Sequence, residues 1–131
     1  MTDRDEQAIR AVIDDQVDAL NKGDAERLRQ TLSMRPDAVH IGTGTGEWWT
    51  GQQVADGVAE QADSGIQVVL DDVSIHVAGD VAWVESRGHF SNQAGGTRPT
   101  RETVVFVREN GGWKCVQSHA SIGVPNEAIF A

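Results

Sequence analysis

Hydrophobic residues in the first third of the chain recur at the spacing of an α-helix. From residue 3 to residue 21 they lie three or four positions apart, which places them on one helical face: Ala8, Ile9, Val12, Ile13, Val17 and Leu20. Gly23 is a natural end for this helix, and Asp24 can cap a second, shorter helix that ends before Pro36. The chain is therefore predicted to begin with a long helix, a tight corner and a short helix.

The pattern changes from helical to alternating in the second half of the chain. A brief strand is expected at 37–42, and the capping box formed by Thr50 and Gln53 predicts a third helix that ends near Gly65. Beyond it, apolar and polar residues alternate in four segments separated by turn residues: 66–77, 81–90, 101–108 and 113–122. This order predicts an α+β fold, with three N-terminal helices packed on a curved antiparallel sheet that encloses a pocket. We expect one domain over 1–131, because this length suits a single core.

Asn110 and Gly111 predict the tightest turn of the sheet. Asn-Gly between alternating hydrophobic segments is typical of a two-residue hairpin turn, in which both central residues need a positive φ. Counting outward from such a turn places Glu102 opposite His119. The shared face is then apolar near the turn and polar at its far end, as a pocket lining would be: Glu102, Val104, Phe106, Trp113, Cys115, Gln117 and His119. A three-residue turn would instead place Thr103 or Arg101 opposite His119.

The charge and composition of the chain exclude some partners. Its 11 Lys and Arg against 20 Asp and Glu give a net charge of −9, so we expect neither nucleic acid nor an anionic membrane as a partner. The sequence has no apolar run near the ~18 residues of a membrane span and no signal-peptide pattern, which favours a cytoplasmic location. Cys115 is the single cysteine, and its place on an apolar strand face favours a buried packing role.

Three stretches of the sequence carry a family likeness. They are Asn21-Lys22-Gly23-Asp24, the 42–51 stretch with Glu47-Trp48-Trp49, and the segment 113–127. With the order of the elements, they resemble the nuclear transport factor 2-like superfamily, and more closely its SnoaL-like proteins. The last stretch is also similar to the association domain of calcium/calmodulin-dependent kinase II. The resemblance implies a cone-shaped fold with an internal pocket and, commonly, a homodimer through the sheet. The chain has no Tyr, so the Tyr-based machinery of ketosteroid isomerase cannot be transferred to it.

Glu102 and His119 are the candidate catalytic pair. A carboxylate facing an imidazole across two strands, with Cβ atoms ~5 Å apart, would orient the ring and raise its basicity. The imidazole would then act as a general base. The alternative is that His119 is a structural hydrogen-bond anchor. A serine nucleophile is disfavoured, because Ser118 points to the opposite face and Ser121 lies ~6.6 Å along the strand.

Five further residues are candidates for ligand binding. Trp48 could cover a pocket or stack on a flat ligand, and Gln117 and Phe106 share the predicted pocket face. Arg87 and His89 lie on one side of their strand. If that side faces the pocket, the Arg87 guanidinium would anchor an anionic ligand. If the other side faces inward, Arg87 is a solvated cation, and the pattern leaves both arrangements open.

Neither the glycines nor the histidines indicate a cofactor or a metal. The glycine-rich stretch 42–46 favours a turn over a phosphate loop, because it lacks G-x-G-x-x-G spacing and a following Gly-Lys-Ser/Thr. The histidines are widely separated and form no ligand pattern: His40, His76, His89 and His119. We therefore predict no metal site and no cofactor.

Three classes of function fit these observations. The first is a cofactor-independent isomerase, dehydratase or cyclase that applies acid–base chemistry to a small, largely apolar molecule. The second is a non-catalytic binder with the same pocket. The third is a homo-oligomeric assembly module with a filled interior and an apolar outer sheet face: Val105, Val107, Val116 and Ile122. We favour small-molecule binding, with catalysis left open, in a homodimer formed through the sheet.

Overall fold

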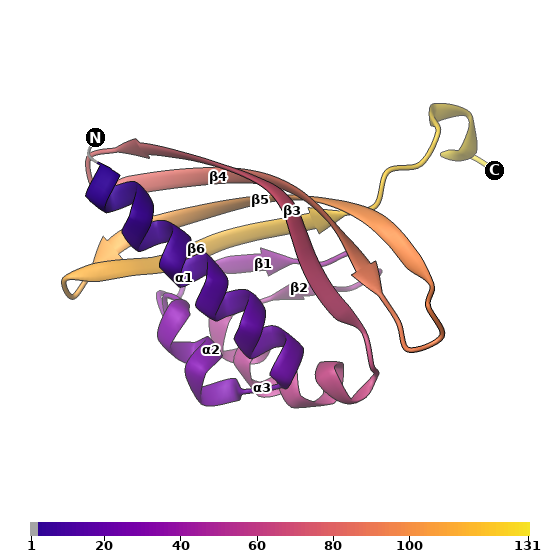
Figure 1. Cartoon of the computed structure of the whole chain (residues 1–131), viewed down its shortest axis with the longest axis horizontal. Coiled ribbons are helices and arrows are strands. Elements are labelled where there is room, and N and C mark those ends of the chain that lie inside the picture. Colours follow the sequence, from indigo (N-terminus) through magenta and orange to yellow (C-terminus); the bar gives the residue numbers. More distant parts are fainter. Residues whose placement is uncertain (1–2) are drawn as a thin grey trace.

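Three α-helices cover one face of a six-stranded sheet in the computed structural model of the chain, which describes residues 3–131 (Figure 1). The helices are α1 (Asp3–Lys22), α2 (Ala25–Thr31) and α3 (Gly51–Asp63). The strands are β1 (Val39–Ile41), β2 (Trp48–Trp49), β3 (Gln67–Ala78), β4 (Val81–Ser91), β5 (Thr97–Glu109) and β6 (Gly112–Ser121). The predicted α+β fold, with three helices packed on a curved sheet, is confirmed.

The helices begin and end at the residues that the sequence indicates. Asp24 caps α2 by accepting a hydrogen bond from the backbone N–H of Arg27. Thr50 and Gln53 form the predicted capping box at the start of α3, with both reciprocal hydrogen bonds present. Gly23 has a φ of 70°, and a Cβ placed on it would lie 2.9 Å from the Cβ of Ala62. A side chain here would therefore separate the corner between α1 and α2 from α3.

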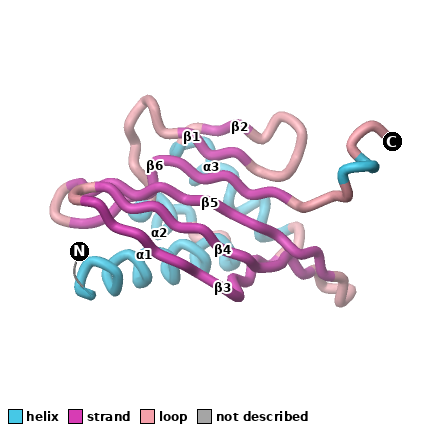
Figure 2. The backbone as a smooth tube through the Cα atoms, turned by 90° about the horizontal axis from the view of Figure 1, so that it is seen from above, coloured by secondary structure: helices cyan, strands magenta, loops and turns pink. Residues whose placement is uncertain are grey.

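The sheet has the strand order β2-β1-β6-β5-β4-β3. Strands β3 to β6 form the predicted antiparallel meander. The sheet is mixed, however, because β1 pairs with β6 in parallel, and Trp48 and Trp49 form a short strand that the sequence did not predict. The two strands β1 and β2 extend the sheet beyond β6, as Figure 2 shows. They bring segments far apart in sequence to the same end of the fold.

A β-bulge in β6 changes the predicted pairing of Glu102 with His119. The turn is the two-residue kind, with positive φ at Asn110 and Gly111. The register shifts, however, between the pairs Val105–Gln117 and Phe106–Cys115, so that Val116 has no opposite residue on β5. Beyond this extra residue every side chain of β6 changes face relative to the prediction. Glu102 is therefore opposite Ala120 and Thr103 is opposite His119, and the predicted pairing is wrong.

The core lies at the turn end of the sheet, beneath α1 and α2. Its most deeply buried large side chains are Ile9, Leu28, Val58, Phe106 and Cys115. Burial raises the pKa of the Cys115 thiol to about 12, which agrees with a packing role and not with that of a nucleophile. After β6 the chain leaves the sheet and ends in a short projecting segment (Figure 1). Within residues 3–131, no helix is both long and apolar enough to cross a membrane.

Candidate functional site

A cavity of about 630 Å³ lies between the helices and the inner face of the sheet, toward the end away from the core. Its walls are mostly apolar, and the largest apolar contributions come from α1, α2, α3 and the ends of β3 and β4: Ile13, Val17, Leu20, Leu28, Val54, Val68, Leu70 and Phe90. Exposed residues among the lining mark the mouth, at the glycine-rich turn and at the end of α3. A small ligand of mainly apolar surface fits such a space.

The strand register places four polar side chains on the inner face of the sheet at this cavity. In one row, Ser86 of β4 is opposite Glu102 of β5. In the next, Ser118 of β6 lies beside His40 of β1, which is opposite Trp49 of β2. These four residues and Trp49 line the cavity. Because Ser118 is diagonal to Glu102 across the β5–β6 pair, and His40 is one strand further, Glu102 and His40 are separated by roughly 10 Å at the backbone.

His40 is fixed in the sheet by a single side-chain contact. Its Nδ1 shares a hydrogen bond of 2.8 Å with the Ser118 hydroxyl. The side chain is only 4% exposed, and its Nε2 is buried without a hydrogen-bond partner among the described residues. Burial lowers the pKa of the imidazole, because the charged form would lose its hydration. His40 is therefore held in its neutral form, and its second ring nitrogen is buried and unsatisfied.

Glu102 is the acidic counterpart on the same inner face. Its carboxyl is half-buried and has no hydrogen bond or ion pair with another described residue. Burial raises the pKa of this carboxyl, which favours the protonated form. The cavity thus contains a carboxyl and an imidazole whose surroundings both favour the uncharged state, and such groups can donate and accept protons near neutral pH.

The other charged groups of the lining are acidic. Glu47 and Glu60 contribute to it, whereas no Lys or Arg of the described chain does. Glu47 belongs to the glycine-rich turn between β1 and β2, where its carboxylate accepts a hydrogen bond of 3.0 Å from the Gly44 N–H. A Cβ at Gly42 or Gly44 would overlap that carboxylate. The stretch is a turn, as predicted, and its glycines make room for a side chain of the protein itself.

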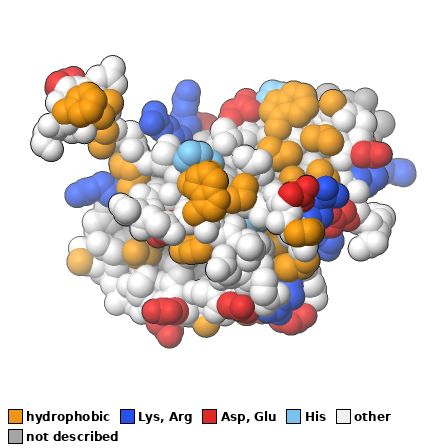
Figure 3. All heavy atoms as spheres, turned by 180° about the vertical axis from the view of Figure 1, so that it is seen from behind, with side chains coloured by type: hydrophobic (Ala, Val, Ile, Leu, Met, Phe, Trp, Pro, Cys, Tyr) orange, Lys and Arg blue, Asp and Glu red, His pale blue; other side chains and the backbone are white. Residues whose placement is uncertain are grey.

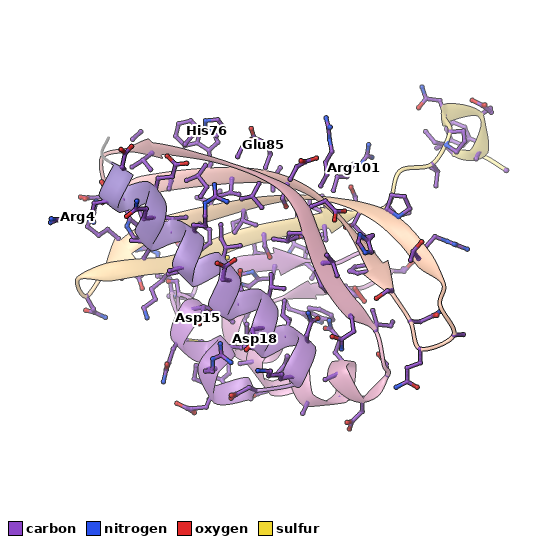
Figure 4. All side chains as sticks on the ribbon, viewed as in Figure 1. Arg4, Asp15, Asp18, His76, Glu85 and Arg101 are labelled. Atoms are coloured by element: carbon purple, nitrogen blue, oxygen red, sulfur yellow. The ribbon has the colours of Figure 1, made fainter. Side chains whose placement is uncertain are left out.

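The structure separates the two residues predicted to act together. Glu102 lines the cavity, but the His119 residue is exposed to solvent. It contributes to the cavity's rim, yet its neighbour Ser118 points inward to His40, so the His119 side chain is directed to the outer face with Thr103. Figure 4 shows Arg101, the neighbour of Glu102 on the other side of β5, projecting away from the helices. His119 contributes to the rim, whereas the His40 side chain lies on the inner face with Glu102.

None of the five residues predicted to bind the ligand lies in the cavity lining of the described chain. Arg87 and Gln117 are exposed on the outer face, so the alternative in which Arg87 is a solvated cation applies. His89 shares a hydrogen bond of 3.0 Å with Asp71 near the start of the bulged β3–β4 pair. Trp48 is 68% exposed and Phe106 is fully buried in the core. Trp49 takes the place at the cavity that Trp48 was predicted to occupy.

Sequence reasoning did not select His40, Ser118 or Ser86 as site residues, whereas Trp49 was considered together with Trp48. The alternation in 37–42 places His40 on one face, but it does not show that this short strand pairs with β6. Ser118 was set aside as a partner of His119 for a sound reason, since adjacent strand residues point to opposite faces. That same rule makes Ser118 an inward residue once the bulge is known.

Among residues 3–131, no three His, Cys, Asp or Glu side chains are grouped closely enough to hold a metal ion.

The fold and the cavity together define a class of protein, an α+β cone with an internal space between its helices and its sheet. A sequence profile of the SnoaL-like domain matches residues 9–125. The chain therefore belongs to the SnoaL-like family, within the nuclear transport factor 2-like superfamily, as its motifs predicted. No curated protein sequence matches this chain.

Solved structures with the same fold are numerous but distant in sequence. A nuclear transport factor 2-like protein of unknown function from Pseudomonas putida is 19% identical, with a TM-score of 0.84 over 97% of this chain and 92% of that one. A superfamily member from Salmonella enterica is 22% identical, with a TM-score of 0.82 over 100% and 99%. A proposed dehydratase from Streptomyces avermitilis is 22% identical, with a TM-score of 0.79 over 95% and 100%. At this identity the likeness shows the fold alone.

Proposed function

We propose that the chain binds a small, largely apolar molecule in the cavity and that Glu102 and His40 carry out cofactor-independent acid–base chemistry on it. The observation that carries the proposal is that the two groups face one cavity, and burial favours the neutral form of each. A neutral carboxyl can donate a proton and a neutral imidazole can accept one. The separation across β6 leaves room for a ligand between them.

The reaction class that fits these groups is isomerisation next to a carbonyl group. In the proposed reaction His40 donates its Nδ1–H to the Ser118 hydroxyl, and the ligand displaces the packing around Nε2 so that its lone pair removes a proton from a carbon beside the carbonyl. The electron pair of that C–H bond forms a C=C bond to the carbonyl carbon, while the π pair of the C=O bond moves onto its oxygen, which accepts a hydrogen bond from the protonated Glu102. Return of the proton from Nε2 to a different carbon re-forms the C=O bond and completes the isomerisation with no net change of atoms. Ser118 is a positioning residue, since it fixes the imidazole ring and its tautomer.

A pair of matched variants tests whether the cavity is the binding site. Val104 lines the cavity, and its neighbour Val105 points to the outer face. Val104→Phe should fill part of the space and abolish binding of an apolar fluorescent probe such as a naphthalene carboxamide, whereas Val105→Phe should leave binding unchanged. Equal binding by both variants would contradict the proposal.

The chemistry is tested with a β,γ-unsaturated cyclohexenone, whose conversion to the conjugated isomer is followed by ultraviolet absorbance. Exchange of its protons for solvent deuterium, followed by NMR, reports proton removal even if no isomer accumulates. Glu102→Gln and His40→Gln should each lower either rate by about 100-fold, the lower end of general acid–base effects. Arg101→Gln, on the outer face beside Glu102, is the control. If the two cavity variants retain the rate of the wild type, Glu102 and His40 are not the reacting groups.

We also propose that two copies associate through the outer face of the sheet. Trp83 and Val81 of β4 are 46% and 41% exposed there, and Trp83 stacks against His76 with ring centroids 5.5 Å apart. Figure 3 views the molecule from the side opposite α1, with the outer face of the sheet along its upper edge, and shows separate groups of apolar side chains among charged ones. Light scattering should give a dimeric mass that Trp83→Glu reduces to that of a monomer. A monomeric wild type at micromolar concentration would exclude this association.

A further inference from the structure

We infer that the cavity excludes anionic ligands such as carboxylates and phosphates and takes molecules whose polar group carries no negative charge. This inference rests on the proposed function of the cavity as a binding site, and it defines the class of molecule that the site takes. It differs from the expectation drawn from the sequence, in which an arginine could anchor an anion. The observations that carry it are the charges of the cavity lining and an unpartnered buried ring nitrogen.

The ionisable part of the cavity lining, apart from His40 and His119, is acidic. It includes the carboxyl groups of Glu47, Glu60 and Glu102, and no Lys or Arg of the described chain contributes to it. An anion in the cavity would thus meet no counter-ion while losing most of its hydration, which costs several kcal/mol in a protein interior. It would also lie near the carboxylates of Glu47 and Glu60, which carry its own charge. The net charge of −9 adds repulsion at longer range.

The arginines nearest in the fold are directed elsewhere. Arg87 and Arg101 are exposed, on the outer face of the sheet. Arg27 of α2 forms ion pairs with Asp15 and Asp18 of α1. Arg29 contacts Glu26 and Asp56. None of these side chains is placed to neutralise an anion inside the cavity.

His40 marks the polar end of the expected ligand. It is 4% exposed, and its Nε2 is buried without a partner. A buried ring nitrogen with no partner is costly unless another molecule supplies a hydrogen bond. Because the imidazole is neutral and its Nδ1–H is donated to Ser118, Nε2 can accept that bond from a hydroxyl or an amide N–H group, but it brings no positive charge. The apolar body of the ligand would then contact α1, α2 and α3.

The test compares two naphthalene derivatives of nearly the same shape, the carboxamide and the carboxylate, by fluorescence titration at pH 7.5. The wild type should bind the carboxamide at least about tenfold more tightly, because the carboxylate must give up its hydration. Glu60→Gln removes one carboxylate from the lining and should narrow this difference without reversing it. Glu127→Gln, in the exposed C-terminal segment, should not change it.

The two ways of failing are distinguishable. If the carboxylate binds as tightly as the carboxamide or more tightly, and Val104→Phe blocks both, the cavity is a binding site but the inferred exclusion of anionic ligands is wrong. If neither probe binds, or if Val104→Phe leaves binding unchanged, the cavity is not a binding site and both proposals are overturned.

Discussion

His40 and Ser118 come from parallel strands, 78 residues apart in the sequence, and are joined by a hydrogen bond of 2.8 Å between Nδ1 and Oγ. This contact joins the short strand β1 to β6, the last strand of the antiparallel meander. It also fixes the orientation of the His40 imidazole, which lies on the inner face with Glu102. The same hydrogen bond therefore joins the two strands and, in the proposed reaction, positions the imidazole.

Ser118→Ala should destabilise the protein by about 1–3 kcal/mol, because it leaves both ring nitrogens of buried His40 without a partner. Ser121→Ala is the control. Its hydroxyl bonds to Arg101 on the exposed face, so its loss should cost less than about 0.5 kcal/mol. Urea unfolding gives both values. Nitrogen-15 NMR of the imidazole should also show that the tautomer of His40 changes in Ser118→Ala alone. Equal stabilities of the two variants would mean that the hydrogen bond has no structural role.

Gly88→Ala should destabilise the protein by about 2 kcal/mol or more, since a Cβ at this position would overlap the backbone carbonyl oxygen of Val69 on the neighbouring strand. Gly57, in the middle of α3, has open space around the same position. Gly57→Ala should therefore stabilise the protein by up to about 1 kcal/mol through helix propensity. Thermal unfolding measures the stability of each variant relative to the wild type. A neutral Gly88→Ala would show that β3 and β4 can separate at this point without loss.

The Cys115 thiol should react with a disulfide reagent at least about 1,000-fold more slowly in the folded protein than in urea. It is fully buried, and burial raises its pKa to about 12, so reaction needs an opening of the structure. A Thr103→Cys substitution in a Cys115→Ala background supplies an exposed thiol on the outer face of β5. That thiol should react at the rate of the unfolded chain. Rapid labelling of native Cys115 would contradict its placement in the core.

Periodicity was sufficient to predict the helices and the four long strands. Hydrophobic spacing predicted α1, the capping residues at 24 and 50 predicted the starts of α2 and α3, and Asn-Gly predicted the turn between β5 and β6. These are local properties, in which each residue acts on its neighbours along the chain. They led to the family and the fold correctly.

The candidate site depended on two features that are not local. The pairing of β1 with β6 is a contact between segments about 80 residues apart, and nothing in 37–42 specifies its partner. The bulge at Val116 has no signal in the sequence, because a valine is an ordinary strand residue and no glycine marks the position. Glu102 keeps its predicted inward face, since the bulge lies on β6 and leaves the alternation of β5 unchanged. His119 changes face, since it follows the extra residue along β6.

Deletion of Val116 tests whether the bulge determines which histidine shares the cavity. Without this residue the hairpin would pair as predicted from the turn, with Glu102 opposite His119 and Ser118 directed outward. The His40–Ser118 hydrogen bond would be lost, and the imidazole of His119, which is exposed in the wild type, would be forced inward. The deletion should therefore lower stability by roughly 3 kcal/mol or prevent folding.

The control for that deletion is removal of Thr45, which is exposed in the turn between β1 and β2 and should cost much less. Chemical denaturation compares the unfolding free energies of the two deletion variants. A Val116 deletion variant with wild-type stability and an intact signal from the His40–Ser118 pair would show that the rest of the sheet sets the register.

Glu102→Gln should stabilise the protein at neutral pH and have little effect in acid. Burial raises the pKa of the carboxyl in the folded state, so between its unfolded value and its folded value the native state binds more protons than the unfolded state. By linkage, the stability of the wild type then falls as pH rises through this window, and it is fully retained below the ordinary pKa of a glutamate. Gln carries no such penalty at any pH. The difference in unfolding free energy between Glu102→Gln and the wild type should thus be near zero at pH 4 and grow towards pH 8. The same difference for the control Glu127→Gln should not change with pH. A difference that stays constant with pH would show that Glu102 is ionised in the folded protein as it is in water, and the acid assigned to the cavity would be lost.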